Sequence, residues 1–581
     1  MKKTENWRNN CTYRSSAKWI YSNFVDYDNG FRAITRKAKV RFETRDWTGA
    51  RADLSERIDL YEKSVLITVN GFKDRHQNIP LGMADWDSIQ SVYWKRVAGV
   101  PHGQFSKTFF NSVYRTVLHS EGKDPKHISD TAGIVSSLVP IKYQPTLKYY
   151  LNWGEIRAMV YDLFSDYKFG APFVDLDDDV DFVCQKIVNA IPTAKENQNA
   201  VLRIEVMKEI FYQSSRAFIV GKIYGSENFQ PFIIALEHTE LGVKTEAVLN
   251  TVDETSVLFG FTRSYFMVDV EPVESAVHFI TSLIPQKPRD ELHTMLGRAR
   301  QGKTERARLL YTHLASSGKE DKFEHARGEP GLVMLVFTMP SYDLVFKVLR
   351  DNFGHPKTVT HNEVKKKYQF VYKHDRAGRL IDTQEFRNIE FPLKQISKQL
   401  LEELLSQCGD TAHISGENLV IEHLYSERRL IPLNLFIKNM DSKKIADTII
   451  DYGQAIKDLA LTNIFPGDLL IKNFGVSRRG RVIFYDYDEL SLLTSCVFKD
   501  IPVSKFPEDD LRSKPWFHVD KRDIFPQEFI KFIGLNANLR EILVEAHGEI
   551  FTQSYWNSMK QLHLDNLAPE VAPYYRLTSR R

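Results

Sequence analysis

Cysteine is scarce in this sequence, and its few cysteines stand far apart. Cys11, Cys184, Cys408 and Cys496 form no CxxC pair and show no metal-ligand spacing. Structural zinc sites usually place such ligands two to four residues apart, which excludes a site of that kind. We therefore expect reduced thiols, as in a cytosolic protein.

Long apolar runs are also missing. The longest stretches, such as 332–337, fall far short of the ~18 residues that a membrane-spanning helix needs. The first ten residues, MKKTENWRNN, are polar, and no apolar segment that could act as a secretory signal follows them. We expect a cytoplasmic protein without a membrane partner.

Neither sign of charge dominates. The sequence holds 78 Lys and Arg against 75 Asp and Glu, a net charge of +3. Nucleic-acid-binding domains usually carry a clear basic excess, so no nucleic-acid partner is expected. At 581 residues, with 43% hydrophobic and 26% charged residues, the chain should form two to four globular domains.

The two halves of the chain differ in pattern. Apolar residues at helical spacing, as in 53–66 and 180–191, predict a mainly helical region over the first 320 residues. Strand-like pieces at 217–220 and 232–236 interrupt it. A polar stretch then leads to a domain boundary that we place near residue 320.

The C-terminal half predicts a different series of elements. They are, in order, a hairpin of strands 331–337 and 344–349, a helix at 360–374, a strand at 419–421, a long helix at 442–461, a loop, and a hairpin of strands 474–476 and 482–485. This order is typical of the two lobes of a protein kinase.

Residues suited to phosphoryl transfer lie at matching places in this series. The reaction needs a cation on the phosphates, oxygen ligands for Mg²⁺ and a carboxylate near the incoming hydroxyl. Lys347 lies inside an apolar strand, where a lysine is costly unless it faces a phosphate or an acid. Asp468 and Asn473 have the D-x4-N spacing of a kinase catalytic loop. The second hairpin should return Asp486 beside Asn473, where both can bind one metal ion.

Several positions depart from the usual kinase pattern. Pro466-Gly467 replaces the His-Arg before the catalytic Asp, and Tyr487-Asp488 replaces the Phe-Gly after the metal-binding Asp. Glu363 is only a weak candidate for the helix glutamate that pairs with the lysine. The expected phosphate loop is not GxGxxG; its residues are Ala326, Arg327, Gly328, Glu329, Pro330, Gly331 and Leu332. Its two glycines could bring backbone N–H groups to phosphates, and an ordinary turn fits equally well.

Short stretches throughout the C-terminal half resemble isocitrate dehydrogenase kinase/phosphatase. They are 336–341, 345–348, 374–376, 378–379, 382–383, 423–425, 427–429, 432–434, 463–468, 472–476 and 484–489. The Pro-Gly-Asp and Asp-Tyr-Asp-Glu forms, unusual in other kinases, are those of this family. The resemblance implies a bifunctional bacterial enzyme. Such an enzyme phosphorylates and dephosphorylates a serine of isocitrate dehydrogenase, and so controls flux between the tricarboxylic acid cycle and the glyoxylate bypass.

The resemblance also implies roles for the site residues. One nucleotide site would use ATP or ADP with Mg²⁺ or Mn²⁺, and AMP would act as an allosteric effector. Residues 326–332 would form the ATP loop, Lys347 would bind ATP, Asp468 would be catalytic, and Asn473 and Asp486 would hold the metal. Asp382 would serve the phosphatase reaction, although sequence alone favours a helix-end cap there. Lys472 would steady the transferring phosphoryl group, and a solvated loop lysine is the alternative.

Together these observations predict an α+β protein. A mostly helical N-terminal regulatory or substrate-recognition domain (1–320) precedes a protein-kinase-like bilobal domain (321–581), whose N-lobe covers about 321–427 and C-lobe about 428–581. The expected partners are isocitrate dehydrogenase, nucleotides and a second copy of the chain in a homodimer. The alternatives are a pseudokinase-type nucleotide-binding scaffold and a small-molecule kinase of the aminoglycoside or choline type.

Overall fold

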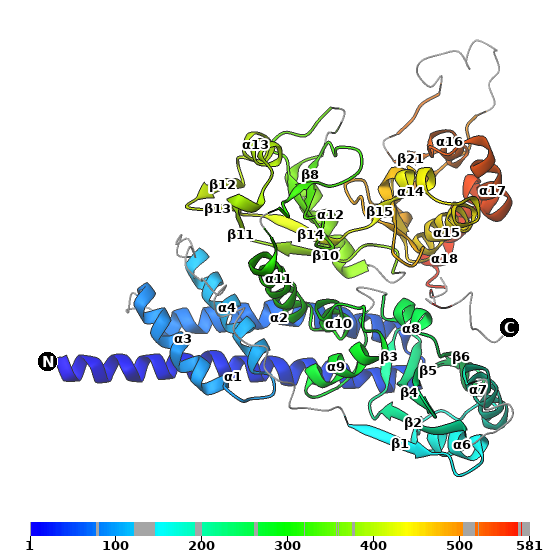
Figure 1. Ribbon diagram of the computed structural model, residues 1–581, viewed down its shortest axis with the longest axis horizontal. Coiled ribbons are helices and arrows are strands. Elements are labelled where there is room, and N and C mark those ends of the chain that lie inside the picture. Colours follow the sequence, from blue (N-terminus) through cyan, green and yellow to red (C-terminus); the bar gives the residue numbers. More distant parts are fainter. Residues whose placement is uncertain are drawn as a thin grey trace. The chain divides into compact units, whose positions relative to one another are not determined.

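The computed structural model describes residues 2–76, 81–120, 146–191, 200–260, 265–318, 320–355, 357, 359–374, 378–502, 517–520, 522–567, 571 and 574. The side chains of 2–11, His119 and 372–374 are outside this description. The chain divides into two compact units. The first comprises 1–260, 265–314 and 574–581, and the second comprises 261–264 and 315–573. Their elements are labelled in Figure 1.

The first unit begins with four helices around an aromatic core. They are α1 (Lys2–Glu43), α2 (Trp47–Arg75), α3 (Met83–Val97) and α4 (Gly103–Ser120). Tyr27, Tyr61, Phe105 and Phe109 pack ring against ring, with centroids 5.3 to 6.0 Å apart. The helix predicted at 53–66 is confirmed as part of α2.

An antiparallel sheet forms the rest of the first unit's core. Its strand order is β1-β2-β4-β5-β6, with β3 paired to β4. The strands are β1 (Leu147–Leu151), β2 (Val201–Met207), β3 (Phe211–Gln213), β4 (Arg216–Gly225), β5 (Phe229–Thr239) and β6 (Gly242–Leu249). The predicted pieces 217–220 and 232–236 lie at the centres of β4 and β5, which pair in register. The sheet is therefore larger than those pieces indicated.

Within the described residues, six further helices belong to the first unit. They are α6 (Ile156–Asp166), α7 (Leu176–Ala190), α8 (Val252–Leu258), α9 (Val273–Leu283), α10 (Arg289–Met295) and α11 (Ala299–Ser316), whose last two residues belong to the second unit. The predicted helix at 180–191 is α7, and the Asp175 carboxylate caps its first turn by accepting from the backbone N–H of Asp178.

Tyr574, almost at the end of the chain, belongs to the first unit. Its side chain is 2% exposed and meets the Phe218 ring edge to face. Its hydroxyl donates to Glu246 at 2.7 Å, and Glu246 also accepts two hydrogen bonds from Arg216 at 2.6 and 2.8 Å. The chain thus returns to the first unit after it has formed the second.

The amino-terminal part of the second unit is a five-stranded antiparallel sheet of order β10-β14-β9-β8-β7. Its strands are β7 (Glu324–His325), β8 (Met334–Thr338), β9 (Leu344–Leu349), β10 (Thr383–Phe386) and β14 (Leu424–Arg428). The β8–β9 hairpin confirms the predicted hairpin, and α12 (His361–His374) confirms the predicted helix. Beside these lie α13 (Lys398–Gln407) and a small sheet of β11 (Ile389–Pro392), β13 (Asn418–Ile421) and β12 (Ala412–Ser415), in which β13 contains the predicted strand 419–421.

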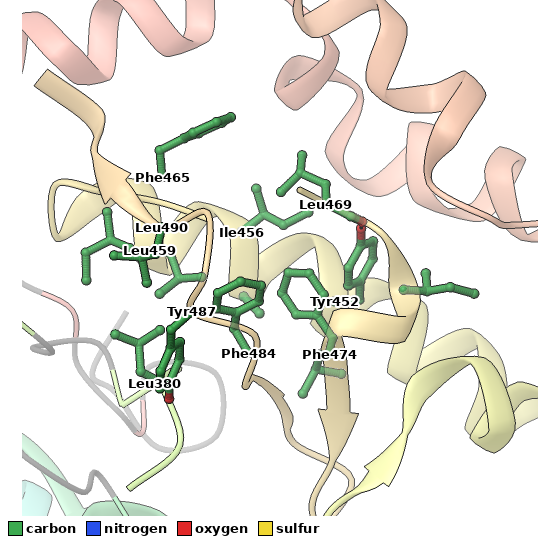
Figure 2. Close-up of a cluster of buried hydrophobic side chains, with 14 of the residues drawn as sticks. Leu380, Tyr452, Ile456, Leu459, Phe465, Leu469, Phe474, Phe484, Tyr487 and Leu490 are labelled. Carbon is green, nitrogen blue, oxygen red and sulfur yellow. The ribbon is translucent and has the colours of Figure 1, made fainter. Parts of the chain in front are cut away.

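The carboxyl-terminal part of the second unit is built on α15 (Ser442–Leu461), which has the predicted bounds. The strands β15 (Ile431–Pro432), β17 (Phe474–Val476) and β18 (Val482–Phe484) form a sheet beside it, and β17–β18 is the second predicted hairpin. Figure 2 shows the hydrophobic core between these elements, to which Tyr452, Phe474, Phe484 and Tyr487 contribute. The remaining elements are α14 (Leu433–Asn439), β16 (Ile464–Phe465), β19 (Ser491–Leu492), β20 (Val497–Phe498), β21 (Asp523–Ile524), α16 (Pro526–Phe532), α17 (Ala537–His547) and α18 (Gln553–Leu564).

A buried ion-pair network ties the segment before β10 to α15. The Arg379 guanidinium contacts both oxygens of Asp451 at 2.8 and 2.9 Å and one oxygen of Asp458 at 2.7 Å. Asp451 also accepts from the N–H of Val482, and Asp458 accepts from Gln454, both at 2.7 Å. Each acid therefore has several donors.

Two other expectations concern cysteines and membranes. Cys184, Cys408 and Cys496 are free thiols, and the side chain of Cys11 is outside the described residues. Within the described ranges, no helix combines the length and apolar character that crossing a bilayer requires.

Candidate active site

Lys347 lies in the middle of β9 and is 7% exposed. Its Nζ contacts Oε2 of Glu427 at 2.7 Å and donates to the carbonyl oxygen of Tyr485 at 2.9 Å. Tyr485 immediately precedes Asp486, so the ammonium group points to the segment expected to hold the metal. This confirms that the strand lysine faces an acid.

The glutamate that pairs with Lys347 comes from a strand, so Glu363 is wrong as its partner. Glu363 accepts from the backbone N–H and the hydroxyl of Thr360 at 2.7 and 2.9 Å, and so caps its own helix α12. Glu427 lies on β14, which pairs directly with β9. Burial raises the pKa of Glu427 above its ordinary value, although Lys347 and Thr383 oppose that change.

The loop after β16 carries Asp468 and Lys472. Gly467 has φ +84°, and a Cβ at this position would lie 2.7 Å from the carbonyl oxygen of Glu489, so the turn requires glycine. Oδ1 of Asp468 accepts from the N–H of Leu470 at 2.9 Å. Burial raises the pKa of Asp468, and the Leu470 N–H opposes that rise. Lys472 is exposed and contacts Glu329 of the predicted phosphate loop at 3.2 Å.

The β17–β18 hairpin brings Asn473 beside the residue that precedes Asp486. Phe474 and Phe484 are register partners, and the N–H of Tyr485 donates to the carbonyl oxygen of Asn473 at 3.1 Å. The backbone return that the sequence predicted is therefore present. Binding of one ion by both side chains stays a prediction.

Asp486 forms a carboxyl pair with Asp488. Burial, and then the hydrogen bond with Asp488, raise the pKa of Asp486 well above its ordinary value. Burial raises the pKa of Asp488 as well, but its hydrogen bonds with Asp486 and Lys357 lower that pKa overall. Lys357 lies 2.9 Å from Asp488 and 2.5 Å from Glu489. The raised pKa of Asp486 and the lowered pKa of Asp488 favour the negative charge on Asp488.

The oxygen atoms of this cluster suit a hard divalent cation. Mg²⁺ usually takes one or two protein carboxylates and completes its shell with phosphates and water, and Asn473 and Asp486 fit that requirement. Burial and the neighbouring Asp488 carboxyl raise the pKa of Asp486, and a divalent cation held there would favour its charged form. Across the described parts of the chain, no group of three or more His, Cys, Asp or Glu residues forms a complete protein-only site.

Asp382 is 4% exposed and lies directly before β10, so it does not cap a helix end. Both of its oxygens are 3.3 Å from Nε2 of Gln384. The preceding segment runs beside β18: the N–H of Phe484 donates to Arg379, and the N–H of Ile381 donates back to Phe484, at 2.7 and 3.2 Å. This ladder places the Asp382 segment next to the strand that leads to Asp486.

The predicted phosphate loop lies inside a hairpin, because β7 precedes it and β8 follows it. We expected it to precede the first strand, and the two-residue β7 is too short to show as a pattern. Gly328 has φ +137°, and the carbonyl oxygen of Gly331 accepts from Arg350 at 3.0 Å. An exposed loop between the first two strands of the sheet is compatible with phosphate binding.

Sequence reasoning missed Glu427, Lys357 and Asp488 as members of the site. The acidic run 486–489 was the one signal for Asp488. Glu427 carried no local signal, because its role depends on the pairing of β14 with β9 and β10. Lys357 lies between a strand and a helix, where a lysine is unremarkable in sequence.

Comparisons with known proteins cover almost the whole chain. The model of the isocitrate dehydrogenase kinase/phosphatase (AceK) regulatory domain matches residues 17–318, and that of the kinase domain matches 321–576. Isocitrate dehydrogenase kinase/phosphatases of Anaeromyxobacter sp. (strain Fw109-5) and Xanthomonas euvesicatoria pv. vesicatoria (strain 85-10) are each 38% identical, over 96% of both chains. That of Anaeromyxobacter dehalogenans is 37% identical over 97% of both. This chain, with its regulatory and kinase domains, belongs to the isocitrate dehydrogenase kinase/phosphatase family.

Proposed function

We propose that this protein phosphorylates a serine of isocitrate dehydrogenase with ATP and also removes that phosphate. By doing so it would set the flux between the tricarboxylic acid cycle and the glyoxylate bypass. The observation that carries the proposal is the contact of Lys347 with Glu427 and with the carbonyl oxygen before Asp486. This contact joins the lysine that we assign to ATP to the segment that we assign to the metal, in a chain whose relatives are named isocitrate dehydrogenase kinase/phosphatase.

We assign the kinase roles by position. Lys347 would bind the phosphates of ATP together with the loop 326–332, and Asp468 would accept the proton of the incoming serine hydroxyl. Lys472, beside that carboxylate, would steady the phosphoryl group. Asn473 and Asp486 would hold Mg²⁺ or Mn²⁺, which when bound neutralises charge on the phosphates.

We assign Asp382 to the phosphatase reaction. Its carboxylate is buried, and the segment before it runs beside the strand that leads to Asp486. A carboxylate in that place can orient or deprotonate a water molecule. AMP as an effector, a cytoplasmic location, a homodimer and a domain boundary near residue 320 belong to the same proposal.

Transfer and release of labelled phosphate test this function directly. The full chain is incubated with Mg²⁺, γ-labelled ATP and isocitrate dehydrogenase, and the labelled product is then chased with ADP. We expect label on a serine, followed by its release. Nucleotide binding without transfer would indicate a scaffold instead, and transfer to a small alcohol such as choline or an aminoglycoside would indicate a small-molecule kinase.

A further inference from the structure

Glu427 occupies a central position in the sheet of the second unit. Its strand β14 lies between β9, which carries Lys347, and β10, which begins directly after Asp382. In the register Glu427 faces Val345 on one side and Thr383 on the other. Its side chain is 1% exposed. A carboxylate so deeply buried is costly, and its retention needs compensating contacts.

The two carboxylate oxygens of Glu427 serve the two neighbouring strands separately. Oε2 contacts Nζ of Lys347 at 2.7 Å. Oε1 accepts a hydrogen bond from the hydroxyl of Thr383 at 2.8 Å. Thr383 is 1% exposed and is the residue immediately after Asp382. One side chain therefore contacts both the proposed ATP lysine and the backbone segment of the proposed phosphatase carboxylate.

We propose that Glu427 is a positioning residue shared by the kinase and phosphatase reactions. Its Oε2 orients the Lys347 ammonium toward the nucleotide, and its Oε1 fixes the Asp382 segment through the Thr383 hydroxyl. Thr383 is then a positioning residue that supports the phosphatase reaction selectively. The inference rests on the function proposed above and gives roles to two residues for which the sequence analysis predicted none.

The strand origin of this glutamate has a mechanical consequence. In kinases whose glutamate lies on a helix, movement of that helix breaks the ion pair and switches the enzyme off. Here Lys347 and Glu427 lie on hydrogen-bonded neighbours of one sheet, and Glu363 of α12 is engaged at its own helix end. Displacement of α12 would therefore leave the lysine aligned.

Variants of the full chain test the two contacts of the Glu427 carboxylate separately. Thr383→Val keeps the shape of the side chain but removes the donor to Oε1. We expect the ratio of phosphatase kcat to kinase kcat to fall about tenfold, as for a lost hydrogen bond to a charged group. Thr383→Ser should restore the ratio to within about twofold, because it returns the hydroxyl. Glu427→Gln keeps an acceptor for Thr383 but removes the charge facing Lys347, so the KM for ATP should rise about tenfold.

Thr448→Val is the matched control. Thr448 is a buried threonine of α15 whose hydroxyl donates to its own helix at Lys444. Loss of this hydroxyl should leave the ratio of phosphatase kcat to kinase kcat and the KM for ATP unchanged. Thermal unfolding of each variant shows whether it folds.

Three results would overturn the proposal. One is an equal loss of both activities in Thr383→Val, another is a failure of Thr383→Ser to restore the ratio, and the third is an unchanged KM for ATP in Glu427→Gln. The unaltered chain is assayed before any variant. If it lacks phosphate transfer or release, the proposed function itself is wrong.

Discussion

Two clusters of buried charge in the second unit differ in how completely their acids are paired. In the network of Arg379, Asp451 and Asp458, every acid has at least two donors within 2.9 Å. Burial alone would raise the pKa of Asp451, but the Arg379 guanidinium and the Val482 N–H lower it below its ordinary value. The charges of this network are satisfied within the protein.

The acids of the candidate active site behave in the opposite way. Burial is the largest cause of the raised pKa of Asp468, Glu427 and Asp486, and their protein donors do not offset it. A folded chain keeps such costly groups where a ligand or a reaction uses them. The contrast separates a cluster whose charges are paired within the protein from the one to which we assign a metal ion and a nucleotide.

The largest expected effect is on the rate of phosphoryl transfer. Asp468→Asn should lower the kinase kcat by ~10²–10⁴ because it removes the carboxylate that we assign to accept the serine proton. ATP binding and thermal unfolding should change little, since an Asn oxygen can still accept from the Leu470 N–H. Steady-state kinetics and calorimetric titration measure the two quantities. A variant that keeps its kcat would remove Asp468 from the chemistry.

Breaking the network of Arg379, Asp451 and Asp458 should lower the free energy of unfolding. Arg379→Met leaves Asp451 and Asp458 buried without their cation, which should cost about 3–5 kcal/mol of unfolding free energy. Urea unfolding of the full chain, followed through the second unit, measures this loss. Arg387→Met is the control: its side chain is 69% exposed and paired with Glu385, so the loss should stay below about 1 kcal/mol. Equal losses in the two variants would contradict a structural role for the buried network.

Metal binding should depend on pH because of Asp486. Its pKa is raised, so below that pKa a proton must leave before the carboxylate can bind the Mg²⁺ that we assign to it. Affinity for Mg²⁺–ATP should therefore weaken as pH falls, by up to about tenfold per pH unit below that pKa. Calorimetry in buffers of different ionisation enthalpy counts the released proton. Asp486→Asn should abolish that release, and a release that persists in this variant would assign the proton to another group.

The smallest effect should follow from Glu363. Glu363→Ala removes two hydrogen bonds at the start of α12 and should cost about 1 kcal/mol, as for the loss of a helix cap. The KM for ATP should not change, because Lys347 pairs with Glu427. Steady-state kinetics measure the KM for ATP, and thermal unfolding measures the loss of stability. A raised KM would restore Glu363 as a partner of the lysine.

Local periodicity was enough to predict the elements that carry the site. The bounds of α15 agree with the prediction, α12 begins one residue later than predicted, and β8 and β9 pair as the predicted hairpin. These elements were predictable because helical and strand spacing repeat within a few residues. The same local patterns predicted that Lys347 lies inside a strand and that Asp486 follows one.

Contacts that depend on strand order were beyond sequence reasoning. Glu427 meets Lys347 and Thr383 only because β14 inserts between β9 and β10, and no spacing along the chain encodes that order. Glu363 was considered as the partner of Lys347 because kinases usually place this glutamate on a helix. That choice was wrong because strand order brings Glu427 to the lysine instead. The edge strand β1 and its partner β2 were likewise missed, since they lie on opposite sides of two intervening helices in sequence.

The contact of Tyr574 with Glu246 and Phe218 has a consequence for shortened versions of the protein. A chain ending a few residues early would lose a donor to Glu246 and an aromatic neighbour of Phe218, both deep in the amino-terminal sheet. Loss of residues at the carboxyl end would then destabilise a sheet that lies some three hundred residues earlier in the sequence. Dissection of the two halves should accordingly supply this tyrosine to the amino-terminal piece, for example as a short peptide added in trans.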